Sequence, residues 1–317
     1  WNSTNTSLDV TLTLPPDTAI TDFNVLDGWS RYYNDQSGNV TSHGTNNLQL
    51  NTLTLEVWTK VLSADTYDGM VAYGQDVDAS ESGYGFIYFN GLWLFYLITD
   101  DMVASNPDDG NSNDWFSNPA TSIQNGVWTH LAGTYDGSVI KLFKDGVLVS
   151  SLNQTGNVDY DNIDLTEFFI GKFKYENGGD GGFEYFDGYV SEVRVWNYAR
   201  SQEKIAGFRS WTLNGDEPGL VSYWKMAEGT GIVLTDETDN SNGTCPSSGW
   251  ENNAPPTLIN PDLLDPVYDP EALVGANVIL GASVNGSEYA DFGINNQITQ
   301  NDLTGEMTAS TSADYLE

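Results

Sequence analysis

The sequence contains little cysteine, little histidine and no long apolar run. A single cysteine, Cys245, occurs among 317 residues, so no disulfide can form within the chain. Two histidines cannot build a histidine-rich zinc site, and with one cysteine they leave Ser-His-Asp and Cys-His catalytic arrangements nearly excluded. No apolar run of about 18 residues is present, so nothing predicts a helix that spans a membrane.

Basic residues are scarce as well. Lysine and arginine number 11 against 45 aspartates and glutamates, which gives a formal net charge of −34. No basic residue lies between Lys60 and Lys141 or after Lys225. Such a charge repels nucleic acid and anionic membranes and favours cations and neutral partners. The acidic side chains can serve as a solubilising surface, or some of them can bind Ca²⁺.

Short apolar or alternating segments separated by tight turns dominate the rest of the chain. Around residues 52–61, Leu53, Leu55 and Val57 alternate with polar residues, and Asn90-Gly91 joins two apolar runs as a hairpin turn would. The pattern predicts an all-β fold, an antiparallel sandwich. Strands are expected at residues 52–61, 85–89, 92–98, 128–135, 139–143, 147–152, 168–173, 190–196 and 220–225.

Helix and linker signals are few. One short helix is expected at residues 199–208, where Ser201 can cap the N-terminus. Five prolines between Ala254 and Pro270 predict an extended linker. The expected organisation is an N-terminal strand extension (1–24), a β-sandwich (25–252), a proline-rich linker (253–271) and a C-terminal β extension (272–317).

Three long motifs occur in the central part. They are Asn125–Val149 (NGVWTHLAGTYDGSVIKLFKDGVLV), Phe186–Ile205 (FDGYVSEVRVWNYARSQEKI) and Gly219–Thr244 (GLVSYWKMAEGTGIVLTDETDNSNGT). Together they resemble the laminin G-like domain, a relative of pentraxins and legume lectins in the concanavalin A-like lectin/glucanase superfamily. The resemblance implies an antiparallel jelly-roll β-sandwich. Within it, Trp128 and Trp196 are expected in the core, and His130 is expected to be a structural, hydrogen-bonded residue.

Relatives on this fold include retaining glucanases, which need two carboxylates about 5–5.5 Å apart. The family pattern Glu-x-Asp-x-x-Glu is absent: Glu184 and Asp187 have the wrong spacing, and Asn242 stands where the last glutamate would follow Glu237 and Asp239. A glycoside hydrolase is therefore the minor alternative, and the chain is expected not to be an enzyme.

The same resemblance implies oxygen ligands for Ca²⁺. The acidic loop at 236–242 matches best, with Asp236, Asp239 and Asn240 as candidate ligands of a structural calcium ion. The loops at 108–114 and 76–81 are weaker candidates. A solvated acidic loop is the alternative reading of each.

Sugar binding would use aromatic side chains beside polar loops. Trp115 and Phe116 follow one acidic loop, and Tyr175 and Tyr185 flank a glycine-rich loop. These four residues are the candidate carbohydrate-binding residues, although the same side chains could pack under long loops.

The setting is expected to be extracellular, at a cell surface or secreted. The chain begins at Trp1 without a signal peptide, as a processed secreted protein would. Asn-x-Ser/Thr sequons that could carry glycan on surface loops occur at Asn2, Asn5, Asn39, Asn153, Asn242 and Asn285.

Two apolar segments outside the sandwich have no evident strand partner. Residues 8–14 alternate and stop at Pro15-Pro16, and residues 273–284 follow the linker. Because an unpaired strand is costly, these segments could insert into a neighbouring subunit and build an open homopolymer. The first hypothesis is therefore a structural subunit of an extracellular filament, and the alternative is a Ca²⁺-dependent carbohydrate-binding or adhesion module.

Overall fold

The computed structural model describes residues 29–33, 40–42, 45–65, 67–76, 81–105, 117–161, 167–175, 182–253 and 255, together with four short strands between 281 and 309. The chain divides into two units. One unit is Leu26–Leu258, and the other combines Trp1–Val25 with Ile259–Glu317.

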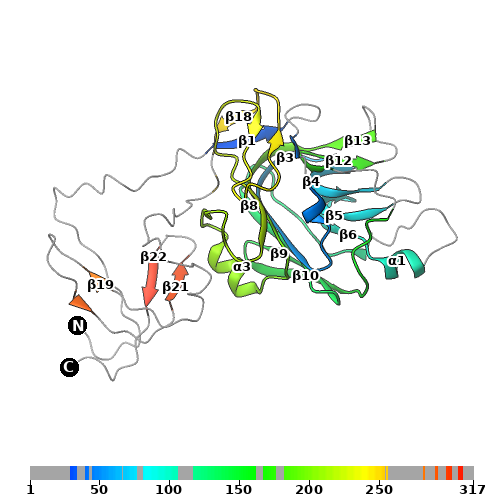
Figure 1. The fold of residues 1–317 in the computed structure, drawn as a ribbon, viewed down its shortest axis with the longest axis horizontal. Coiled ribbons are helices and arrows are strands. Elements are labelled where there is room, and N and C mark those ends of the chain that lie inside the picture. The colour runs from blue at the N-terminus through cyan, green and yellow to red at the C-terminus, as the bar shows by residue number, and fades with distance from the viewer. Residues whose placement is uncertain are drawn as a thin grey trace, which may run out of the picture. The chain divides into compact units, whose positions relative to one another are not determined.

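The larger unit contains an eight-stranded antiparallel sheet (Figure 1). Its strand order is β10-β9-β8-β3-β14-β1-β18, and β15 pairs with β14. The strands are β1 (Trp29–Tyr33), β3 (Leu53–Ser63), β8 (Thr129–Tyr135), β9 (Val139–Lys144), β10 (Val147–Asn153), β14 (Asp187–Trp196), β15 (Leu220–Trp224) and β18 (Trp250–Asn252).

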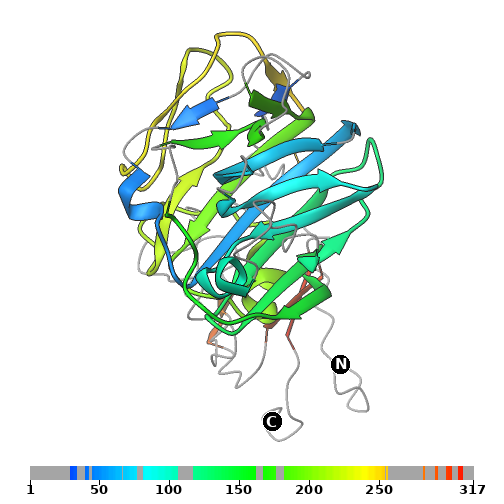
Figure 2. The ribbon, with the colours of Figure 1, turned by 90° about the vertical axis from the view of Figure 1, so that its right-hand side faces the viewer.

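A ten-stranded sheet forms the second layer of this unit. Figure 2 looks onto its strands β4, β5 and β6, which are drawn in blue to cyan and lie side by side. The order is β16-β17-β2-β11-β4-β5-β6-β7, with β12 paired to β4 and β13. The strands are β2 (Val40–Ser42), β4 (Tyr67–Asp76), β5 (Ser82–Phe89), β6 (Leu92–Leu97), β7 (Ala120–Thr121), β11 (Phe168–Ile170), β12 (Lys172–Tyr175), β13 (Phe183–Tyr185), β16 (Val233–Leu234) and β17 (Gly243–Thr244).

The all-β antiparallel sandwich predicted from the sequence is therefore confirmed. The turn at Asn90-Gly91 has positive φ at both residues (50° and 85°), the geometry that two-residue hairpins require. The expected strand at 168–173 is broken by Gly171, whose φ is 86°, so that it forms β11 and β12 instead.

The main core lies between the two sheets. Leu53, Leu55 and Val57 of β3 are fully buried there, as their alternation predicted. At Gly133 of β8 the sheets approach so closely that a Cβ atom would overlap the ring of Phe95 on β6. Glycine is therefore required at this position by the packing between the layers.

Helical segments are few among the described residues. They are η1 (Thr45–Leu48), α1 (Asp100–Ser105) and α3 (Gln202–Phe208). Ser201 caps α3 by accepting a hydrogen bond from the backbone N–H of Lys204, as predicted. No described helix is long and apolar enough to cross a membrane.

The smaller unit contains two described hairpins. One pairs β19 (Gly281–Ala282) with β20 (Ala290–Asp291), and the other pairs β21 (Ile298–Asn301) with β22 (Glu306–Ala309). The segment 8–14 and most of 273–284 lie outside the described residues. Strand exchange and filament assembly find no support in the described part of the chain and stay predictions.

We expect Gly133→Ala to destabilise the protein by about 1–3 kcal/mol, because the added methyl group must displace the Phe95 ring in a close-packed core. Urea unfolding followed by tryptophan fluorescence measures the change. Ser151→Ala, at an exposed position of β10, is the control and should stay within about 0.5 kcal/mol of the parent. Equal stability of Gly133→Ala and the parent would contradict the close approach of the sheets.

Candidate functional site

The densest group of charged side chains lies on the outer face of the eight-stranded sheet, beneath the segment 197–217 that includes α3. Glu56 of β3, His130 of β8, Arg194 of β14 and Arg200 are each at most 2% exposed. Charged groups are almost never buried this completely unless they are paired, so their partners define the role of the layer.

Glu56 is the centre of the first set of contacts. Its Oε1 accepts a hydrogen bond from Nη1 of Arg200 at 2.5 Å, and its Oε2 lies 3.2 Å from Nε2 of His130. Burial opposes ionisation of Glu56, but Arg200 and His130 outweigh it and hold its pKa below the ordinary value. For His130 burial dominates and lowers the pKa, although Glu56 partly compensates. The structural role predicted for His130 agrees with its burial and its position beside Glu56.

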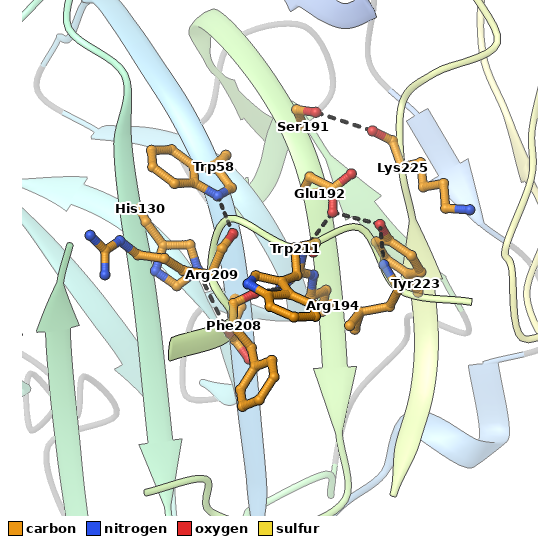
Figure 3. Close-up of polar contacts among 12 residues, drawn as sticks. Trp58, His130, Ser191, Glu192, Arg194, Phe208, Arg209, Trp211, Tyr223 and Lys225 are labelled. Carbon is orange, nitrogen blue, oxygen red and sulfur yellow. Dashed lines mark hydrogen bonds and ion pairs between the residues drawn. The ribbon is translucent and has the colours of Figure 1, made fainter. Parts of the chain in front are cut away.

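A second set of contacts joins Glu192, Arg194 and Tyr223 (Figure 3). Oε2 of Glu192 accepts hydrogen bonds from Nη2 of Arg194 at 2.6 Å and from the hydroxyl of Tyr223 at 2.5 Å. Arg194 also donates to the backbone oxygens of Phe208 and Trp211 in the covering segment. The φ of Glu192 is +54°, within a β-bulge of β14 that turns its side chain toward these partners.

This buried layer is structural rather than catalytic. The carboxylates of Glu56 and Glu192 both pair with arginine and are almost completely shielded from solvent. A substrate could reach neither of them without opening the layer. Its effect is to attach the segment 197–217 to the sheet.

The loop at 236–242 was the best candidate for a calcium site, but the side-chain oxygen atoms of Asp236 are not free to coordinate a metal ion. Oδ1 of Asp236 accepts hydrogen bonds from the backbone N–H groups of Tyr223 (2.8 Å) and Thr238 (3.0 Å) and from the Thr238 hydroxyl (2.8 Å). Oδ2 accepts from the N–H of Ser241 at 2.9 Å. A carboxylate offers about four acceptor positions, so those of fully buried Asp236 are already used.

The two other candidate ligands do not complete a site either. Asp239 is exposed at a left-handed turn, and the side-chain amide of Asn240 donates to the backbone oxygen of Val221. No described group of three His, Cys, Asp or Glu side chains is placed to hold a metal ion. Asp236 therefore organises this loop, and calcium binding stays a prediction that these donors do not favour.

The carboxylates weighed for glycoside hydrolysis lie on different elements. Glu184 is on β13 and Asp187 begins β14, where it accepts a hydrogen bond from Ser63. Glu237 forms an ion pair with Lys225 at 3.1 Å. Two of these three carboxylates are thus already engaged with another side chain.

The sequence-based sugar candidates are not brought together. Trp115 and Phe116 lie outside the described residues. Tyr175 and Tyr185 both belong to the β12–β13 hairpin, but the strand pairing places them on opposite faces of it. Among the sequons, Asn153 and Asn242 have exposed side chains, and Asn2, Asn5, Asn39 and Asn285 lie outside the described part.

Tyr175 instead joins two aromatic residues that sequence reasoning missed. Its ring stacks on that of Tyr67 at 4.3 Å, and Tyr67 lies 5.0 Å from Phe89 on the neighbouring strand. All three side chains, which we call the aromatic stack, are partly exposed on the outer face of the ten-stranded sheet. The signal that could have located Phe89 is its position before the Asn90-Gly91 turn, where a hairpin register can be predicted.

Carboxylates border the aromatic stack. Glu184 lies on the same face of the hairpin as Tyr175, and burial together with the nearby charge of Asp65 raises its pKa. Burial and a hydrogen bond with Tyr175 also raise the pKa of Tyr67, so its hydroxyl stays protonated. The stack thus combines apolar ring surface with hydroxyl donors and carboxylate acceptors.

The prediction that Trp128 belongs to the core was wrong, whereas Trp196 is fully buried as expected. Trp128 precedes β8 and is partly exposed on the outer face of the eight-stranded sheet. Its ring centroid lies 6.3 Å from that of Tyr189, and its indole N–H donates to Oδ1 of Asn253.

Residues 34–206, more than half of the chain, match the family described as the Concanavalin A-like lectin/glucanases superfamily, in its laminin G type. The chain therefore belongs to this superfamily. No curated protein sequence matches it.

Several solved structures are similar. A putative carbohydrate binding protein from Bacteroides ovatus is 18% identical over 71% of this chain and 59% of its own length, with a TM-score of 0.49. A heptameric SAP-like pentraxin from Limulus polyphemus is 13% identical over 57% of this chain and 81% of its own (TM-score 0.39). The CBM40 of a Ruminococcus gnavus IT-sialidase is 14% identical over 56% and 96% (TM-score 0.38). Likenesses this distant establish neither ligand nor activity.

The burial of His130 predicts a contribution to pH-dependent stability. Its pKa is lowered from 6.5 in the folded state, so the unfolded chain binds the proton first and the free energy of unfolding falls as the pH drops below about 6.5. One such group changes stability by at most about 1.4 kcal/mol per pH unit. Urea unfolding between pH 7 and pH 5 should show a smaller loss in His130→Gln.

Comparison of the parent with His130→Gln isolates His130, because the other titratable groups are present in both proteins. Among them, Glu184 and Glu228 have raised pKa values and change the stability with the opposite sign. His43→Gln, at the only other histidine, is the control. Identical pH profiles of the parent and His130→Gln would reject the assignment.

The geometry of Asp236 predicts that its loop is stable without metal. Asp236→Ala leaves buried N–H groups unsatisfied and should lower the free energy of unfolding by about 2–5 kcal/mol. Asp239→Asn, at the exposed left-handed turn, should be nearly neutral. Addition of a calcium chelator should leave the melting temperature of the parent unchanged. A fall in melting temperature that added calcium reverses would restore the metal hypothesis.

Proposed function

We propose that the protein is a non-catalytic carbohydrate-binding module of an extracellular or cell-surface protein. Two things support the proposal: membership of a superfamily whose name covers lectins and glucanases, and the aromatic stack on the exposed side of the ten-stranded sheet. The stack is the single observation that carries it. Folds of this kind host many functions, so the argument depends on the site.

A sugar ring has one face that is largely C–H and a rim of hydroxyl groups. Tyr175 stacks on Tyr67 and both side chains are partly exposed, so aromatic surface is available for a pyranose to pack against. Tyrosine supplies such apolar area together with a polar hydroxyl at little entropic cost. The neighbouring Glu184 can accept hydrogen bonds from sugar hydroxyls.

The charge around the aromatic stack favours an uncharged glycan. Glu184 borders the stack, and Asp65 lies close enough to Glu184 to raise the pKa of Glu184. These local carboxylates oppose the approach of a carboxylated or sulfated sugar to this site.

Hydrolysis is not favoured. The buried carboxylates of Glu56 and Glu192 are paired with arginine, Asp187 accepts a hydrogen bond from Ser63, and Glu237 is paired with Lys225. Incubation with soluble β-glucan and measurement of new reducing ends tests this directly, and we expect none to form.

Binding to neutral polysaccharides tests the proposal. Affinity electrophoresis through gels containing β-glucan, xylan, galactomannan or arabinan should show retardation of the parent protein. Tyr175→Ala should weaken binding to the retained polysaccharide by about tenfold or more, equivalent to about 1.4 kcal/mol, because it removes an exposed stacking surface.

Tyr185→Ala is a matched control on the opposite face of the same hairpin and should bind like the parent. Circular dichroism checks that both variants are folded. Absence of retardation in every gel, or equal losses in the two variants, would contradict the proposal.

A further inference from the structure

A second group of partly exposed aromatic residues lies on the outer face of the eight-stranded sheet. Tyr32 of β1, Tyr189 of β14 and Lys60 of β3 occupy one cross-strand row, because Tyr32 pairs with Tyr189 and Tyr189 with Lys60. Trp128 joins them from the segment before β8. We call these four residues the outer cluster.

The contacts within the outer cluster are close. The rings of Tyr32 and Tyr189 are 5.1 Å apart, and Nζ of Lys60 lies 5.5 Å from the centroid of the Tyr189 ring. Trp128 is tilted against Tyr189 and hydrogen-bonded to Asn253. Each of the four side chains remains partly exposed, so aromatic surface and an ammonium group face solvent together.

Lys60 is unusual in lacking a carboxylate partner. The chain has 45 acidic residues for 11 basic ones, yet Lys60 forms no ion pair with a described residue, and its ammonium group lies over the ring of Tyr189. Arg194 and Arg200, by contrast, each form an ion pair with a glutamate. The carboxylate of Asp187, two residues before Tyr189, accepts a hydrogen bond from Ser63.

We propose that the outer cluster binds a sugar unit that carries a carboxylate, such as a uronic acid residue of an acidic polysaccharide. The sugar ring would pack on the aromatic surface of Trp128 and Tyr189. Its carboxylate would form an ion pair with Lys60, and Asn253, which accepts a hydrogen bond from Trp128, lies beside the cluster. The proposal rests on the proposed function only in taking a sugar as the ligand.

The negative net charge does not prevent such binding at physiological ionic strength. Salt screens exposed charges beyond about 8 Å, so the local group around Lys60 decides the interaction and distant carboxylates contribute little. An exposed ion pair alone is worth at most about 1 kcal/mol, and the aromatic contacts must therefore supply the larger share of affinity. The outer cluster contains both the ammonium group for an ion pair and the aromatic rings for stacking.

The two sites differ in chemistry and in place. The aromatic stack belongs to the ten-stranded sheet and is bordered by carboxylates. The outer cluster belongs to the eight-stranded sheet and contains an ammonium group that has no ion pair with any described residue. Substitutions at one site can therefore be read independently of the other.

Affinity electrophoresis and calorimetry with polygalacturonate and alginate test the inference, with fully methyl-esterified pectin as the uncharged form of the first ligand. We expect binding to polygalacturonate or alginate in ~0.15 M salt and much weaker binding to the methyl ester. Lys60→Gln and Tyr189→Ala should each reduce affinity about tenfold or more, and Lys60→Arg should retain most of it.

Lys141→Gln is the matched control. Lys141, on β9, likewise has no ion pair among the described residues, and none of the described aromatic rings forms a cation–π contact with it. The Lys141→Gln variant changes the net charge as much as Lys60→Gln does, and it should bind acidic polysaccharides like the parent.

Three results would overturn the inference: no binding to either acidic polysaccharide, equal binding of polygalacturonate and its methyl ester, or equal losses in Lys60→Gln and Lys141→Gln. The Tyr175→Ala variant distinguishes failure of this inference from failure of the proposed function. It should leave polygalacturonate binding intact, and loss of neutral-glycan binding in this variant would keep the proposed function even where the outer cluster fails.

Discussion

The pairing of buried charge on the outer face of the eight-stranded sheet is the constraint on which much of the structure depends. Glu56 and Arg200 are 144 residues apart in sequence and meet at 2.5 Å. Arg194 makes a similar connection by donating to backbone oxygens of the segment that covers it. Removal of one partner from such a pair costs about 3–5 kcal/mol, so the covering segment and the strands must stay together.

This covering decides which part of the outer face stays accessible to solvent. One part of the outer face is closed by the segment 197–217, while the row of Tyr32, Tyr189 and Lys60 remains partly exposed. On the other sheet, Tyr67 and Tyr175 are likewise left at the surface. Aromatic side chains in a lectin-like sandwich thus divide into those that build the core and those that present ring surface to solvent.

Local sequence patterns predicted much of the fold but less of the candidate site. Alternation in β3 and the Asn90-Gly91 turn predicted strands correctly because both depend on neighbouring residues. Trp128 begins one expected strand and Trp196 ends another, so their local patterns were alike, yet only Trp196 is buried. The acidic character of Asp236 suggested a metal ligand, but the N–H donors that occupy it come from residues up to 13 positions away.

The amino-acid sequence by itself determined the class of fold, because strand periodicity, turn residues and three long motifs are properties of contiguous segments. Only the tertiary structure decided which aromatic residues share a surface and which charged groups are paired. Tyr175 and Tyr185 are close in sequence but face apart, whereas Tyr67 and Tyr175 are distant and stack. The physical reason is strand register, since a shift of one residue moves a side chain to the other face of the sheet.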